Sequence, residues 1–87
     1  MSKSERVWLV ERTYTDRDLV VLVYATPDGR QRLRKELAPT MLRQTTVTAA
    51  TKADPSNLEP VDDGATVDRY VTEVERVRES HDPDDPI

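Results

Sequence analysis

The stretch DLVVLVYATPDGRQRLRKEL, residues 18–37, decides the fold of this 87-residue chain. Its apolar part, LVVLVYA, is too short and too rich in β-branched side chains for a buried helix, so it predicts a strand that is covered on both faces. Pro27-Asp28-Gly29 is a strong turn signal, because proline fixes φ at the first turn position and glycine supplies a left-handed residue. Arg30–Leu37 then returns as a second strand, which completes a β-hairpin at the centre of an antiparallel sheet.

A three-residue turn also predicts the register of this hairpin, because it sets Thr26 opposite Arg30. Val23 then faces Leu33 on the side of the sheet that a helix covers. Side chains alternate along a strand, so the opposite side of the sheet is expected to carry apolar residues from the first strand of the hairpin and charged residues from the second. We call this surface the predicted arginine face, and it comprises Val20, Leu22, Tyr24, Arg30, Arg32, Arg34 and Glu36.

The rest of the chain supplies the neighbouring elements. Residues 5–13 combine Trp8 with β-branched residues and predict a first strand, joined to the hairpin by a tight turn at 15–17. Residues 39–43 predict a helical turn. Residues 45–52 have the threonine and valine content of a fourth strand, although their alanines fit strand or helix.

A helix is predicted over residues 66–80, because valines and a tyrosine recur there at three- and four-residue spacing and form one apolar stripe. Asp63 or Thr66 would cap its start. The fold class is therefore α+β, with an antiparallel β-meander of three to four strands and one C-terminal helix packed on one face. Residues 1–80 would form a single domain, and residues 81–87 a disordered acidic tail.

Size and composition exclude several classes of protein. A mass of 9.9 kDa leaves room for one small core. The chain has no cysteine, so disulfides and cysteine-ligated metals are excluded. No apolar run approaches the roughly 18 residues that span a bilayer, and residues 1–5 do not resemble a signal peptide. We therefore expect a soluble, cytoplasmic protein with no membrane association.

Charge is distributed unevenly along the chain. The total is -4, but residues 1–44 sum to +3 from nine basic and six acidic residues, and residues 45–87 sum to -7 from four basic and eleven acidic residues. A polyanion would thus meet the first half. In composition, with 10 Asp, 11 Val and 10 Thr but no Phe, the chain resembles small uncharacterised proteins of halophilic archaea. A high-GC genome would produce a similar composition.

Catalytic and cofactor motifs are not evident. The single histidine, His81, adjoins a proline-interrupted tail, where a general base or metal ligand would be poorly held. Gly29 and Gly64 are the only glycines, so no glycine-rich phosphate loop can be written. The sequence accordingly predicts a protein that is not an enzyme and has no catalytic residues, cofactor or metal site.

Two hypotheses use the predicted arginine face. A single helix covers one side of the sheet, so the apolar residues on the other side would need a partner. A second copy of the chain is the commonest one, through sheet packing or edge pairing about a two-fold axis. The first hypothesis is therefore a non-catalytic homodimeric module for protein interaction or structure, in which Arg32 and Arg34 would pair with Glu36 or Glu11. Its interface residues would be Trp8, Val20, Leu22, Tyr24, Arg32 and Arg34.

The alternative is a module that binds RNA or another single-stranded nucleic acid, or a regulatory module, that uses the same face. Arginines interleaved with an aromatic ring on an open sheet are typical of such proteins, because charge follows the phosphates and rings stack on bases. The residues would be Arg30, Arg32, Arg34 and Tyr24. A third option is a small-ligand pocket between Trp8, Tyr24 and the helix, although no convergent polar group supports it.

Overall fold

The structure is a computed structural model that describes residues 4–14, 19–38, 40–41 and 46–87. The tight turn expected at 15–17 lies outside the described residues. So does most of the helical turn expected at 39–43, of which Thr40 and Met41 are described and are helical. The elements are β1 (Glu5–Tyr14), β2 (Val20–Ala25), β3 (Gln31–Leu37), β4 (Ala50–Ala53), the 3-10 turn η1 (Pro55–Asn57), β5 (Glu59–Pro60) and helix α2 (Gly64–Ser80).

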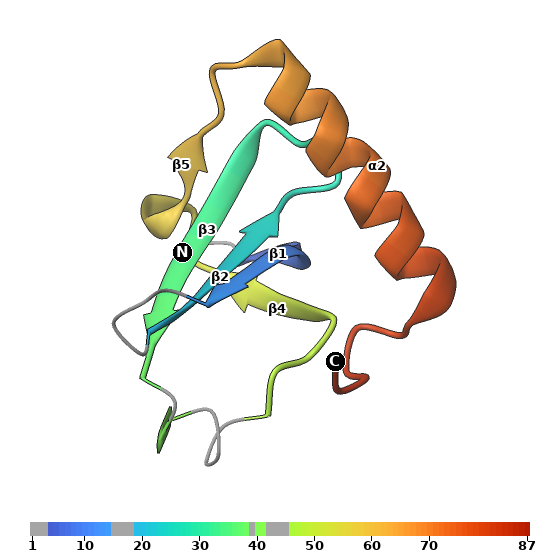
Figure 1. Ribbon diagram of the computed structural model, residues 1–87. Coiled ribbons are helices and arrows are strands. Elements are labelled where there is room, and N and C mark those ends of the chain that lie inside the picture. The colour runs from blue at the N-terminus through green and yellow to red at the C-terminus, as the bar shows by residue number, and fades with distance from the viewer. Residues whose placement is uncertain (1–3, 15–18, 39, 42–45) are drawn as a thin grey trace.

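The strands form one antiparallel sheet in the order β4-β1-β2-β3-β5, and α2 lies along one side of it (Figure 1). The α+β class and the C-terminal helix are thereby confirmed, and the described strands number five rather than three or four. The ambiguous segment at 45–52 contains the start of strand β4, which pairs with β1. β5 is only two residues long and was not expected.

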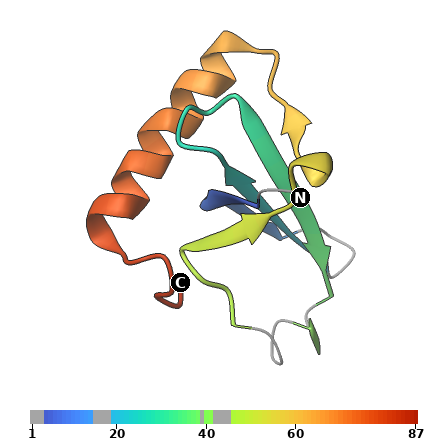
Figure 2. The same cartoon turned by 180° about the vertical axis from the view of Figure 1, so that it is seen from behind.

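The sheet is strongly curved. Residues 54–58 connect β4 at one edge to β5 at the other, and they include the turn η1. A flat sheet would separate these edge strands by about 19 Å, which is beyond the comfortable reach of five residues that contain a turn. The sheet therefore curls, and β4 and η1 lie in front of β2 and β3 when the molecule is seen from behind (Figure 2). A bulge between Leu9 and Glu11 in β1 adds to the bend.

Two apolar clusters lie on opposite faces of this curved sheet. The helix-side cluster comprises Trp8, Val21, Val23, Ala25, Ala49, Ala50, Tyr70 and Val74. The inner cluster, on the face that the curvature encloses, comprises Val7, Leu9, Val20, Leu22, Tyr24 and Ala53, with Leu33, Leu37, Val47 and Leu58 packed around it. A small domain thus buries both faces of its central strand with one helix, because the sheet itself covers the second face.

The predicted hairpin register is wrong by one residue. Tyr24 pairs with Leu33, Val23 with Arg34, and Ala25 with Arg32. The loop has four residues rather than three, since the Thr26 amide donates to the Gln31 oxygen at 3.0 Å, and Arg30 remains in the loop. Because side chains alternate, this shift moves every β3 side chain to the other face.

Helix α2 begins at Gly64, two residues before the predicted start, and ends at Ser80 as predicted. Asp63 is the N-cap residue, but its carboxylate accepts a hydrogen bond from the Thr66 hydroxyl at 2.8 Å rather than from the backbone. Tyr70 and Val74 are the buried residues of the helix, as the apolar stripe predicts.

The tail at 81–87, expected to be disordered, is bonded to the sheet in the structure. The backbone amides of Ala49 and Ala50 donate to the oxygens of Asp85 and Pro83, and the Ile87 amide donates to Val47. The tail thus covers the outer edge at the start of β4. Composition predicts disorder here because the acidic and proline residues cannot build a core, but an unpaired strand edge supplies backbone partners that no local pattern reveals.

Candidate binding site

The apolar residues that were expected to be exposed for a partner are instead buried within the chain. Leu22 is 1% exposed, Val20 1% and Tyr24 4%, all within the inner cluster. Burial also raises the pKa of Tyr24 above its usual value. In the described part of the chain, the curved sheet therefore encloses the apolar face that the sequence suggested for a partner.

Trp8 lies on the other face, against the helix, with the Arg78 guanidinium 5.8 Å from its ring centre. Trp8 and Tyr24 are thus separated by the sheet, and the ligand pocket considered between them is not formed. Both rings are buried, and the register places them on opposite faces, because Trp8 pairs with Ala25 whereas Leu9 pairs with Tyr24.

The predicted arginine face is likewise not formed. Arg32 and Arg34 pair with Ala25 and Val23, whose side chains belong to the helix-side cluster. Tyr24 shares its face with Lys35, whose ammonium lies 5.9 Å from the ring centre. Arg32 and Arg34 therefore do not lie beside this ring. Arg30 is in the hairpin loop and is exposed.

The structure instead brings Arg32 and Arg34 together in a concavity on the helix side, which we call the valine pocket. Its volume is about 400 Å³, and it lies where the helix leaves part of the sheet uncovered. Val21 and Val23 form its floor. The lining residues are Glu11, Thr13, Val21, Val23, Arg32, Arg34, Glu59 and Tyr70.

Sheet register positions the charged groups of the valine pocket. Glu11 on β1 pairs with Val23, and Val23 pairs with Arg34, so the three form one row across the sheet. Arg32 lies two residues along the same strand, where β5 places Glu59 beside it. The pocket therefore has an acidic wall on β1, a basic wall on β3, and an apolar floor between them.

The Arg32 guanidinium is oriented by groups on two other elements. One Nη donates to the buried Tyr70 hydroxyl at 3.4 Å, and Nε lies 3.6 Å from a Glu59 carboxylate oxygen. These contacts raise the pKa of Arg32, chiefly through the Tyr70 hydroxyl. Nε is inaccessible to solvent and has no hydrogen-bond partner within the described part of the chain.

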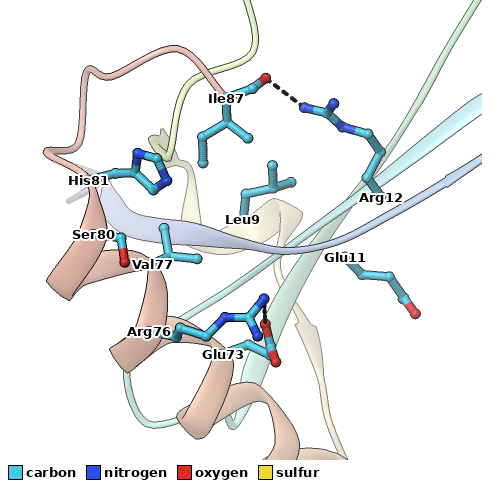
Figure 3. Close-up of a pocket in the computed structure, with 9 residues that line it drawn as sticks. All are labelled: Leu9, Glu11, Arg12, Glu73, Arg76, Val77, Ser80, His81 and Ile87. Atoms are coloured by element: carbon cyan, nitrogen blue, oxygen red, sulfur yellow. Dashed lines mark hydrogen bonds and ion pairs between the residues drawn. The ribbon is translucent and has the colours of Figure 1, made fainter.

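A second cavity, of about 350 Å³, lies between β1, the end of α2 and the tail (Figure 3). Leu9, Val77 and Ile87 point into it. Arg12 donates to the backbone oxygen of Ile87 at 2.7 Å, and Arg76 pairs with Glu73 at 3.5 Å. His81 also lines this cavity, which the sequence did not reveal because it predicted a disordered tail beside this histidine.

Strand β3 has an unpaired edge, which the sequence did not reveal. Its pairing with β5 involves only Gln31 and Arg32. The Gln31 oxygen faces β2 and the Arg30 oxygen faces β5, so by alternation the backbone groups of Arg34 and Glu36 point away from β2. No described strand pairs with Leu33–Leu37 on that side.

The described residues do not assemble a metal site. Across 4–14, 19–38, 40–41 and 46–87, no group of three or more His, Cys, Asp or Glu residues is arranged to hold a metal ion. No helix in that same part of the chain is long and apolar enough to cross a membrane.

These features define a small α+β domain with a curved five-stranded sheet, one covering helix and a charged, valine-floored pocket. The chain belongs to a family of unknown function (DUF7967), whose model matches residues 1–87. No curated protein and no solved structure matches the chain.

Proposed function

We propose that the domain is a non-catalytic interaction module that works as a homodimer, with the β3 edges of two copies paired in one continuous sheet. The observation that carries this proposal is the unpaired edge of Leu33–Leu37 in the described part of the chain. An exposed strand edge is a template for pairing with another chain. The apolar sheet face that first suggested a dimer is not used as the interface in this proposal, because it is buried within each copy.

The free edge selects one register. β5 stops a partner strand at Arg32, and β3 itself ends at Leu37, so the available window is centred on Lys35. A two-fold axis at Lys35 sets Arg34 of one copy opposite Glu36 of the other. In this register the outward backbone groups of both residues form hydrogen bonds with the second copy.

Side chains in this register are complementary. On the helix side, the two-fold axis would create two equivalent pairs between Arg34 of one copy and Glu36 of the other. Both side chains are half exposed, and within one chain they already form an ion pair at 3.3 Å. On the other side, Leu33 would meet Leu37 twice. Each such cross-strand pair contributes roughly 0.2–1 kcal/mol. The opposed Lys35 residues would repel, which limits the affinity.

The test is the absolute mass in solution by light scattering, with circular dichroism to confirm folding. Wild type should give twice 9.9 kDa. Arg34→Glu should weaken the dimer by about tenfold or more, because two attractive pairs become repulsive. Arg34→Glu with Glu36→Arg should restore it. Arg30→Glu, an equal charge change in the exposed hairpin loop, is the matched control.

A monomeric wild type at millimolar concentration would overturn the proposal. So would a dimer that Arg34→Glu leaves intact, because pairing would then use another surface. Titration with single-stranded RNA addresses the nucleic-acid alternative. Separation of Tyr24 from Arg32 and Arg34 on opposite faces favours a protein partner, because stacking and phosphate contacts would not share one surface.

Composition supports a cytoplasmic, halophilic setting as part of the same proposal. Short, strongly hydrated carboxylates keep a protein soluble when molar salt screens their repulsion. We expect the folded dimer to be more stable in molar KCl than in dilute buffer. Urea unfolding at both salt concentrations measures this, and equal or lower stability in molar KCl would contradict the halophilic assignment.

A further inference from the structure

We propose that the valine pocket binds a small dipolar molecule, with an anionic group and a cationic group at the two ends of a short apolar body. Every lining residue comes from one chain, and of these residues Arg34 also belongs to the β3 edge that the proposed dimer uses. Its volume of about 400 Å³ falls in the range of small-ligand sites. The residues that line it determine the class of ligand.

The basic wall would hold the anionic end. Arg32 is oriented by Tyr70 and Glu59, and its side chain remains 38% exposed. Arg34 lies two residues further along the same strand, on the same face. Two guanidinium groups placed in this way can contact one carboxylate with several charge-assisted hydrogen bonds.

The acidic wall would hold the cationic end. Glu11 forms no salt bridge with any residue that the structure describes. It lies across Val23 from Arg34, with one strand between them. Thr13, two residues along β1, adds a hydroxyl to this side.

The floor sets the length and character of the ligand. β1 and β3 are separated by two strand spacings, about 9.5 Å. The Glu11 and Arg34 side chains both line this gap, which leaves room for a short methylene chain over Val21 and Val23. A short, flexible ω-amino carboxylate fits both walls and the floor. A single-charge ligand would leave one wall unused.

The experiment titrates the full-length protein with 5-aminopentanoate, pentanoate and pentylamine, and follows the methyl resonances of Val21 and Val23. The dipolar compound should bind about tenfold or more tightly than either single-charge compound. Glu11→Gln should reduce binding of 5-aminopentanoate to the level of pentanoate and leave pentanoate binding unchanged. Glu75→Gln, on the exposed face of α2, is the matched control.

Arg32→Gln should abolish binding of both carboxylates. Arg32→Lys, which keeps the charge, should retain part of it if the first variant folds poorly. Equal affinity for the three compounds, or no shift at either valine, would overturn the proposal. Light scattering on the same samples reports the mass separately, so a failed pocket and a failed dimer give different results.

Discussion

Gly29, in the hairpin loop, lies against helix α2 so closely that a Cβ atom there would come within 2.5 Å of the Val67 backbone oxygen. Its φ of 72° is in the left-handed region that L residues rarely adopt. The loop between β2 and β3 is thereby docked on the first turns of the helix. A backbone oxygen cannot move aside as a flexible side chain would.

Gly29→Ala should therefore destabilise the protein by about 2 kcal/mol or more, through combined strain and steric overlap. Gly64→Ala is the matched control, because Gly64 begins the helix and a Cβ atom added there would meet nothing within 4 Å. Because Gly64 is the first residue of the helix, that variant should change the free energy of unfolding by less than about 1 kcal/mol. Urea unfolding measures both, and equal effects would contradict the docking of the loop.

A substitution at Leu22 tests whether the inner cluster stabilises the isolated chain. Because it is 1% exposed in the inner cluster, Leu22→Ala should lower the free energy of unfolding by about 2–5 kcal/mol in the isolated chain. Tyr14→Ala, at a residue 69% exposed, should change it by less than about 0.5 kcal/mol. If Leu22→Ala altered only the oligomeric mass, the residue would be at an interface rather than in the core.

Asp28 makes stability depend on pH. Its carboxylate accepts hydrogen bonds from the Thr26 hydroxyl at 2.6 Å and the Arg30 amide at 3.0 Å, and these lower the pKa of Asp28. A pKa that is lower in the folded state contributes stability above the unfolded value of about 3.9, and this is lost as pH falls through the folded value.

Asp28→Asn should therefore be less stable than wild type near neutral pH, and the difference should shrink below about pH 4. Thr26→Val, which removes the hydroxyl donor, should reduce the same pH dependence. Thermal unfolding from about pH 2 to 7 measures both variants. A difference that stays constant across this range would show that the hydrogen bonds do not favour the charged carboxylate.

The tail should protect the edge of β4. Deleting residues 82–87 removes the acceptors of the Ala49 and Ala50 amides, so hydrogen exchange at both should accelerate by about tenfold or more. The Val61 amide, which donates to the Arg30 oxygen at the opposite edge, is the internal control. Unchanged exchange at Ala49 and Ala50 would mean that the tail does not hold this edge.

Strong local patterns correctly predicted strand β2 and helix α2. The β-branched run of β2, the turn residues after it and the apolar stripe of α2 are each set by interactions within a few residues of one another, which a sequence displays directly. Tyr70 and Val74 were expected on the buried face of the helix, and they are buried there.

The prediction of the site was wrong because one residue was misplaced, and this error changed the predicted face of every later residue in β3. Arg30 was placed in β3 rather than in the loop, and that single residue exchanged the faces of Arg32 and Arg34. Local hydrogen bonds of Asp28 support the four-residue loop, and two further contacts hold it, which are the docking of Gly29 on α2 and the hydrogen bond from the Val61 amide to the Arg30 oxygen. Neither contact is local in sequence.

Sequence by itself thus determined the α+β class, the central hairpin and the helix, because short-range patterning and turn chemistry are sufficient for these. Tertiary structure alone decided the curvature that encloses Leu22 and Tyr24, the pairing of the tail with β4, and the pocket that joins Glu11 to Arg34. The physical reason is that curvature and register depend on packing between distant segments, and a one-residue shift in register reverses every side chain of a strand.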